Sequence, residues 1–418
     1  MLRPHLLLMP AMALCAASPA APAVLHVDQA HPACDDDGEG TPSAPFCTID
    51  QAADEAFPGD EVVVASGLYN ERVSPARSGL PGSPIVLRAA DGASVTVTSP
   101  TYGFQISAKS WIVVRGFTVA DTVSYGIYAK DSSFVTIAAN HVTRAGEPVD
   151  GMTRAGIYLN NTSDSVVTGN VTVENTDGGI KLNNAATRNL VEKNISAYNA
   201  RGYTRAAPGI DVRSGGNTIV RNVTHHNEDT GIQIYNGAHD NLIVSNIAYD
   251  NGDHGIDVLR STGQTILNNT VYRNVTAGIN VEGGSTGCRL ANNISVDNAI
   301  QGPRTRGNIR VDTESIPGTT IDHDLVWHSV PDTMITWGSV KHATLAGFVA
   351  ATGMELHGLE ADPLWVSPQA GDFRLTAGSP AIDSADSGAG SAASLQGPSS
   401  ATVAGVSRSP ARTRRAGS

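Results

Sequence analysis

Aspartates concentrate in two neighbouring stretches of the chain that share a Gly-Ile motif. NEDTGIQIY (residues 227–235) contains Asp229, and DNGDHGIDV (residues 250–258) contains Asp253 and Asp257. Carboxylate oxygens are the hard ligands that Ca²⁺ prefers, so the three aspartates predict a calcium site if the fold brings the two stretches together. The alternative is that these side chains cap turns through hydrogen bonds to nearby backbone groups.

Groups that could transfer a proton lie in the same part of the chain. Arg213 and Lys181 are candidates for a catalytic base, and Arg213 ranks first because it comes one repeat before the acidic stretches. His254 and Tyr235 are a second candidate pair of base and acid. Two carboxylates about 5–5.5 or 6.5–9.5 Å apart would instead favour glycosidic hydrolysis. The aspartates available for that reaction are Asp211, Asp229, Asp253 and Asp257.

A Gly-Ile-x-aliphatic pattern repeats along the chain and must position these groups. Its glycines are Gly126, Gly156, Gly179, Gly209, Gly231, Gly255 and Gly278, at separations of 22 to 30 residues. Gly and Asn, which tolerate left-handed backbone, recur where each coil must turn a corner. One repeat cannot bury its apolar face alone, so the repeats must stack. The sequence predicts an all-β fold, a right-handed, single-stranded parallel β-helix.

Strand alternation assigns each residue of the repeat to one side of the strand. In Gly-Ile-x-aliphatic-y, the Ile and the aliphatic residue point inward, and x and y point outward. We expect one buried column of Ile127, Ile157, Ile180, Ile210, Ile232, Ile256 and Ile279. We also expect a hydrogen-bonded ladder at the coil corners, made by Asn175, Asn199, Asn227, Asn251, Asn274 and Asn298.

The outward residues of successive coils should lie about 4.8 Å apart on one flat face. Between Lys181 and Glu282 this face is polar and mixed in charge, which suits an extended sugar chain. The residues expected to bind substrate there are Asp211, Gln233, Tyr235, Asn280 and Glu282.

The two ends of the chain differ from the repeats. Residues 1–23 have the pattern of a secretory signal peptide, and residues 384–418 have the composition of a disordered tail. Between them we expect one β-helix domain, residues 24–383, with regular coils over about 105–300. A capping-box start, Thr48 with Gln51, predicts a short helix that covers the first coil.

Composition narrows the partners and the compartment. The formal net charge of −12 argues against nucleic acid as a partner. No segment after the signal is long and apolar enough to cross a membrane, so we expect a secreted protein. We also expect this protein to be a monomer. Cys34 and Cys47 are candidates for a disulfide in an oxidising compartment, and Cys288 for a buried thiol.

Three stretches resemble a known group of proteins. The N-terminal stretches APFCTIDQAADEAFPGDEVVVASGLYNERV and SGLPGSPIVLRAADG, and the C-terminal stretch DPLWVSPQAGDFRLTAGSPAID, resemble secreted pectate-lyase-like β-helix proteins. Polysaccharide lyase family 9 is the nearest in motif. By this resemblance Asp253 and Asp257 fall on calcium-ligand positions, and Asp229 lies close to another. The family's catalytic lysine follows its calcium cluster, whereas here the only lysine after residue 193 is Lys341.

The resemblance implies a secreted lyase that acts on an acidic extracellular polysaccharide. The expected reaction is calcium-assisted β-elimination on a uronate polymer such as pectate. The alternatives are a uronate C5-epimerase or a glycoside hydrolase that uses the same face, or a carbohydrate-binding β-helix protein of the cell surface without catalytic activity.

Overall fold

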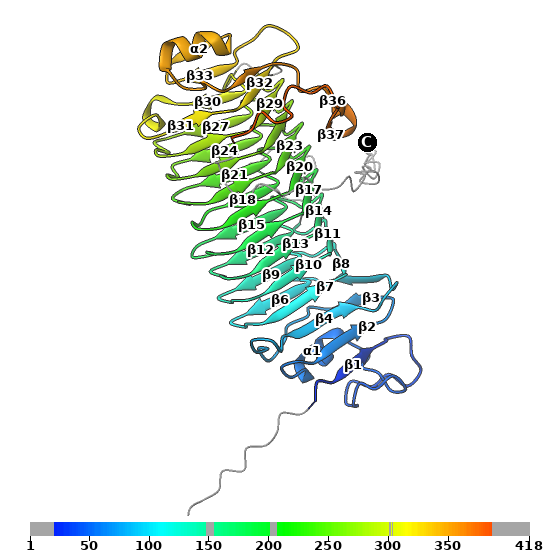
Figure 1. Ribbon diagram of the computed structural model, residues 1–418. Helices are drawn as coiled ribbons and strands as arrows, with labels where there is room; N and C mark the ends of the chain where they lie inside the picture. The colour runs from blue at the N-terminus through cyan, green and yellow to red at the C-terminus, as the bar shows by residue number, and fades with distance from the viewer. Residues whose placement is uncertain (1–20, 148–153, 201–206, 301, 303, 387–418) are drawn as a thin grey trace, which may run out of the picture.

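The computed structural model describes residues 21–147, 154–200, 207–300, 302 and 304–386, which form a long right-handed parallel β-helix (Figure 1). Each coil contributes short strands to three sheets that run along the axis of the helix. The first and second sheets have 12 strands each, and the third has 11. The predicted fold is confirmed.

Strands within each sheet follow the order of the coils. The first sheet contains β1 (Val24–Val27), β2 (Glu61–Val64), β4 (Ile85–Ala89), β7 (Ile112–Arg115), β10 (Thr136–Ala138), β13 (Val166–Thr168), β16 (Leu190–Glu192), β19 (Thr218–Val220), β22 (Leu242–Val244), β25 (Thr265–Leu267), β28 (Arg289–Ala291) and β31 (Thr320–Asp322). The second contains β3 (Gly67–Asn70), β5 (Val95–Thr98), β8 (Thr118–Ala120), β11 (His141–Thr143), β14 (Val171–Val173), β17 (Ile195–Ala197), β20 (Val223–His225), β23 (Ile247–Tyr249), β26 (Thr270–Tyr272), β29 (Ile294–Val296), β32 (Leu325–Trp327) and β35 (Leu359–Glu360). The third contains β6 (Phe104–Ser107), β9 (Ile127–Lys130), β12 (Ile157–Asn160), β15 (Ile180–Asn183), β18 (Ile210–Val212), β21 (Ile232–Tyr235), β24 (Ile256–Leu259), β27 (Ile279–Glu282), β30 (Ile309–Val311), β33 (Ile335–Trp337) and the antiparallel β34 (Val340–His342).

The Gly-Ile repeat forms the third sheet, and its isoleucines form the predicted column. All seven are fully buried, and each pairs in register with the isoleucine of the next coil. The predicted asparagine ladder is also present: each amide from Asn175 to Asn274 donates to the side-chain oxygen of the next asparagine, at 2.8–3.1 Å. Burial of the isoleucine column and the hydrogen bonds between the corner asparagines together hold successive coils in one register.

The N-terminal end is covered by a helix and closed by a disulfide. Helix α1 (Ile49–Glu55) begins at Thr48, whose hydroxyl accepts a hydrogen bond from the backbone N–H of Gln51 at 3.4 Å. Glu71 accepts the free N–H groups of the first helical turn, those of Ile49 and Asp50, at 3.0 and 2.7 Å. The predicted capping helix is confirmed, as is the disulfide between Cys34 and Cys47, which have Cα atoms 5.0 Å apart.

The coils extend beyond residues 105–300 at both ends. They start at β1, and β30 to β33 continue the three sheets after residue 303, where the sequence repeat becomes irregular. Helix α2 (Leu345–Thr352) lies at the C-terminal end of the solenoid (Figure 1). The proposed signal peptide lies outside the described residues apart from residues 21–23, and the proposed tail apart from residues 384–386.

After the last coil the chain returns along the second sheet. The antiparallel strands β36 (Trp365–Ser367) and β37 (Asp372–Leu375) lie beside this sheet (Figure 1), and the ring of Phe373 lies 5.2 Å from that of Tyr249. The described part of the chain contains no helix long and apolar enough to span a membrane. Cys288 is fully buried, as predicted.

Candidate active site

The x positions of the third sheet form a polar row across consecutive coils. Lys181, Asp211, Gln233, Asp257, Asn280 and Arg310 follow one another in register on β15, β18, β21, β24, β27 and β30. These side chains lie on the outward side of the strands, but four of them are covered. Asp211, Gln233, Asp257 and Asn280 are all 2% exposed or less, because neighbouring polar side chains cover them. The y positions Arg213, Tyr235 and Glu282 are half-buried.

Asp211 holds the two predicted basic residues. Lys181 places its Nζ 3.0 Å from one carboxylate oxygen of Asp211, and Arg213 donates from Nε to both oxygens at 2.9 and 3.0 Å. Although burial alone would lower the pKa of Arg213, the charge and hydrogen bonds of Asp211 raise it above its usual value. Both cations therefore neutralise a buried carboxylate, and the raised pKa of Arg213 makes that residue a poor proton acceptor.

Asp257 is the centre of a second network. Tyr235 donates from its hydroxyl to one oxygen of Asp257 at 2.8 Å, and Asn280 donates from its amide to the other at 2.7 Å. Arg310 continues the network, donating to Asn280 Oδ1 at 2.6 Å and to Glu282 Oε2 at 2.7 Å. Burial raises the pKa of Asp257. Burial and the charge of Asp257 raise the pKa of Tyr235, so its phenol stays protonated at neutral pH.

Asp229 and Asp253 form a carboxyl pair at the start of their coils. The backbone N–H of Asp253 donates to the carbonyl oxygen of Asp229 at 3.2 Å, and the charge of the Asp253 carboxyl acts on that of Asp229. Burial, followed by the charge of Asp253, raises the pKa of Asp229 to about 7. Burial would also raise the pKa of Asp253, but the charges of His254 and Arg304 hold it below its usual value. The pair thus contains one carboxyl that titrates near neutrality and one that stays ionised.

His254 lies beneath this pair. It is 3% exposed, and Thr276 Oγ1 and the carbonyl oxygen of Ala277 lie 2.8 and 3.2 Å from its Nδ1. Its Nε2 lies 3.6 Å from Asp253 Oδ1, while Thr276 donates to the same oxygen at 2.5 Å. His254 and Tyr235 contact different aspartates, Asp253 and Asp257, and no contact joins the two within the described residues.

Two arginines at this site escaped sequence analysis. Arg304 forms an ion pair with Asp253, and Arg310 ends the polar row. Arg310 could have been found, because residues 308–311 read Asn-Ile-Arg-Val and so keep the repeat with Asn in place of Gly. Arg304 lies between coils, and no pattern in the sequence marks it.

The oxygens of Asp253 and Asp257, two of the three predicted calcium ligands, are already engaged. Arg304 and Thr276 occupy the two oxygens of Asp253, and Tyr235 and Asn280 occupy those of Asp257. A calcium ion needs six to eight oxygen ligands, so it would have to displace these partners. The calcium site therefore stays a prediction.

Comparison with known proteins identifies the family. Residues 86–309, more than half of the chain, match the family described as "Periplasmic copper-binding protein (NosD)". The chain belongs to the NosD family. The matched residues run from β4 to the start of β30 and include the carboxyl pair and most of the polar row.

One relative among curated proteins comes from Bacillus subtilis (strain 168). This NosD-family chain is 26% identical over 291 residues to a protein described as uncharacterized, YwoF. The alignment covers 53% of the chain and 62% of YwoF, so the chain spans about three fifths of that relative's length.

Solved structures with similar folds include polysaccharide lyases. Pectate lyase Pel9A superposes with a TM-score of 0.57 at 18% identity, covering 86% of this chain and 91% of Pel9A. An alginate lyase from Paenibacillus sp. str. FPU-7 superposes with a TM-score of 0.53 at 18% identity, covering 69% of this chain and 99% of the lyase. At this identity the similarity establishes the β-helix fold. Membership of polysaccharide lyase family 9 stays a prediction.

Proposed function

We propose that this NosD-family protein binds an extended uronate polysaccharide along the third sheet and cleaves it by β-elimination. The observation that carries the proposal is the Asp229–Asp253 pair, in which one carboxyl titrates near pH 7 beside the polar row and Arg304. A general base is most effective when its pKa is close to the working pH. The similar folds of pectate and alginate lyases support the substrate class.

The reaction requires that the substrate carboxylate be neutralised before C5 loses its proton. Arg304 and Arg310 are the cations on this face that could do so, since Arg310 already binds the carboxylate of Glu282 and Arg304 that of Asp253. A guanidinium pairs with a carboxylate through two parallel hydrogen bonds, which also fixes the orientation of the sugar ring. Positive charge beside the carboxylate stabilises the enolate that forms as C5 loses its proton.

Asp229 and Tyr235 supply the two proton transfers. The ionised Asp229 carboxylate takes the proton from C5, the C4–C5 double bond forms, and the bond from C4 to the glycosidic oxygen breaks. Tyr235, kept protonated by burial and by Asp257, donates a proton to the departing oxygen. Asp229 lies close enough to Tyr235 for its charge to raise the pKa of the phenol. Lys181 and Arg213 hold Asp211 in place within the polar row through their ion pairs with its carboxylate. His254 orients Asp253.

The alternatives differ in their products. A C5-epimerase would use the same proton abstraction and return a proton to the opposite face of the sugar. A glycoside hydrolase would use two carboxyls about 5–5.5 or 6.5–9.5 Å apart, and its products would lack the unsaturated uronate.

Export to the periplasm or beyond is part of the proposal. The Cys34–Cys47 disulfide supports an oxidising compartment, and the family description names the periplasm. That description also names copper. Burial raises the pKa of Cys288 to about 11, so this thiol stays protonated and does not offer the thiolate that Cu⁺ prefers.

The test is a substrate panel of pectate, alginate and other uronate polymers, each with Ca²⁺ or with a chelator. Ultraviolet absorbance of the unsaturated uronate should rise on at least one polymer, and Asp229→Asn should abolish the rise. Asp240→Asn, at an exposed turn of the first sheet, is the matched control and should keep full activity. Absence of absorbance on every polymer would overturn the lyase proposal, and inversion at C5 seen by NMR would establish the epimerase instead. Dependence on Ca²⁺ would assign carboxylate neutralisation to the ion.

A further inference from the structure

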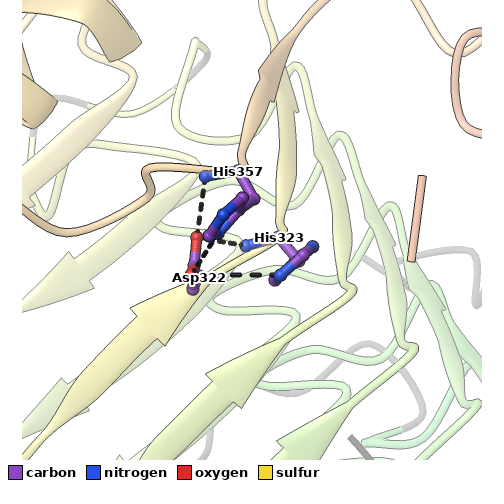
Figure 2. Close-up of side chains that lie close together, drawn as sticks. All are labelled: Asp322, His323 and His357. Atoms are coloured by element: carbon purple, nitrogen blue, oxygen red, sulfur yellow. Dashed lines mark hydrogen bonds and ion pairs between the residues drawn. The ribbon is translucent and has the colours of Figure 1, made fainter. Parts of the chain in front are cut away.

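Two histidines and an aspartate meet at the C-terminal end of the solenoid, away from the carboxyl pair. Asp322 is the last residue of β31, His323 follows it, and His357 lies in the loop between α2 and β35 (Figure 2). Among the described residues, this is the group of three histidine, cysteine or acidic side chains whose ligand atoms all lie within 4.8 Å of one another. All three residues lie outside the segment that matches the NosD family.

The distances within the cluster suit ligands of a single ion. His357 Nδ1 lies 2.9 Å from Asp322 Oδ2, and His323 Nε2 lies 4.0 Å from the same oxygen. The two imidazole rings stack with their centroids 4.6 Å apart and their planes within 13° (Figure 2). Ligands about 2.0–2.2 Å from a zinc ion are separated from one another by comparable distances. A bound ion would replace the proton that His357 Nδ1 donates to Asp322 Oδ2, and rotation of the two imidazole rings would direct their nitrogens to it.

Backbone groups already orient the ligand atoms. Asp322 Oδ1 accepts the N–H groups of His323 and His357 at 2.9 and 3.0 Å, which leaves Oδ2 to face the histidines. His323 Nδ1 lies 3.4 Å from the carbonyl oxygen of Ser384, and a carbonyl can only accept a hydrogen bond. The proton of His323 therefore sits on Nδ1, and the lone pair of Nε2 points to the cluster. Metal-binding histidines are commonly oriented in this way by a carbonyl partner.

The cluster is open to solvent, and its donor atoms select the class of ion. The side chains of Asp322, His323 and His357 are 39, 22 and 62% exposed, so an ion can enter directly. Two imidazole nitrogens and one carboxylate oxygen suit Zn²⁺ or Cu²⁺, whereas Ca²⁺ requires oxygen ligands. Three protein ligands also leave a coordination position for water or another molecule.

We propose that Asp322, His323 and His357 form a binding site for a divalent transition metal ion of the Zn²⁺ or Cu²⁺ class. The site is independent of the proposed lyase reaction, since it shares no residue with the third sheet. It links β31 to the loop before β35, so the bound ion would hold the last complete coil to the C-terminal segment.

The test uses isothermal titration of the mature, metal-free protein with ZnCl₂, CuCl₂ and CaCl₂. One equivalent of Zn²⁺ or Cu²⁺ should bind, and Ca²⁺ should not compete. His323→Ala and His357→Ala should each weaken binding about 100-fold, since loss of even an outer-sphere partner costs 10–100-fold. Asp322→Asn removes the carboxylate ligand but keeps an oxygen that can accept the backbone N–H groups of His323 and His357. This variant should therefore lose metal binding without losing the local fold.

His141→Ala is the matched control, because His141 is exposed on β11 of the second sheet and lies outside the cluster. Electron paramagnetic resonance of the Cu²⁺ form should show coupling to two nitrogens, reduced to one in either histidine variant. The proposal is overturned if neither ion binds, or if wild-type protein and all three cluster variants bind equally. Circular dichroism of each variant confirms that a loss of binding does not reflect unfolding.

Discussion

The backbone N–H of Asp253 donates to the carbonyl oxygen of Asp229 at 3.2 Å, and thereby holds the carboxyl groups of two successive coils side by side. Stacking in register thus creates a like-charged pair that neither coil would contain alone. Because two adjacent carboxylates repel each other, one of them retains its proton to a higher pH. Burial and this repulsion raise the pKa of Asp229 to about 7.

The first prediction concerns the pH dependence of elimination. Asp229 acts as a base only when ionised, so the rate should rise with pH up to about 7 and level off above it. Asp229→Asn should lower kcat by about 100-fold or more, since general-base catalysis contributes 10²–10⁴-fold. The measurement is the initial rate of unsaturated uronate formation between pH 5 and 9. A rate that falls across this range would contradict the role of Asp229.

The second prediction concerns recognition of the substrate carboxylate. Arg310→Ala should lower kcat/KM by about 100-fold, because it removes a cation that stabilises the developing enolate. Arg188→Ala is the control: Arg188 is an exposed residue that pairs with Asp164 in a turn of the first sheet, and its loss should leave the rate unchanged. Equal rates for the wild type and Arg310→Ala would exclude Arg310 from the site.

The third prediction concerns a buried acid pair at the C-terminal end. Burial and the charge of Asp324 raise the pKa of Glu355 to about 11. Folding therefore favours the protonated form, and the contribution of Glu355 to stability falls as pH rises above the unfolded pKa of about 4.3. Glu355→Gln should remove this loss and raise Tm at pH 8 more than at pH 5. Glu314→Gln, at an exposed site, should change Tm at neither pH.

The fourth prediction concerns the asparagine ladder. Asn251→Ala should leave the buried backbone N–H of Asn227 without its acceptor, Asn251 Oδ1, and should interrupt the ladder between Asn227 and Asn274. An unsatisfied buried polar group costs about 1–3 kcal/mol, so the free energy of unfolding should fall by at least that amount. Urea denaturation measures it, with Asn70→Ala at an exposed strand position as control. A cost for Asn251→Ala no larger than that of the control would show that the ladder does not stabilise the coils.

The fifth prediction concerns the isoleucine column. Ile256 is fully buried between Ile232 and Ile279, so Ile256→Ala leaves a cavity and should destabilise the protein by about 2–5 kcal/mol. Ile256→Val should cost about 0.5–1.5 kcal/mol at the same site. If both substitutions cost the same in urea denaturation, packing in the column is not what stabilises the coil.

The repeat made the fold and the strand faces predictable, but not the contacts on the outer face. Gly-Ile-x-aliphatic alternation correctly assigned Ile256 to the interior and Asp257 to the opposite side of the strand. It did not show that Tyr235 and Asn280 would bury Asp257, because that burial depends on side chains from coils before and after. Lys181 and Arg213 were correctly placed on the face, yet the pairing of Lys181 with Asp211 emerges only when β15 and β18 lie in register. Arg213 reaches the same carboxylate from two residues further along the chain.

By itself, the sequence determined the β-helix, its isoleucine column and its asparagine ladder, because each follows from local periodicity that every coil repeats. It also determined the capping helix, because the capping box at Thr48 is a local signal. Only the tertiary structure decided which titratable groups meet. The approach of Asp229 to Asp253, of Arg304 to Asp253, and of His357 to Asp322 depends on how coils and loops of different lengths stack. No local pattern encodes these contacts, since their partners are separated by 24 to 51 residues of chain.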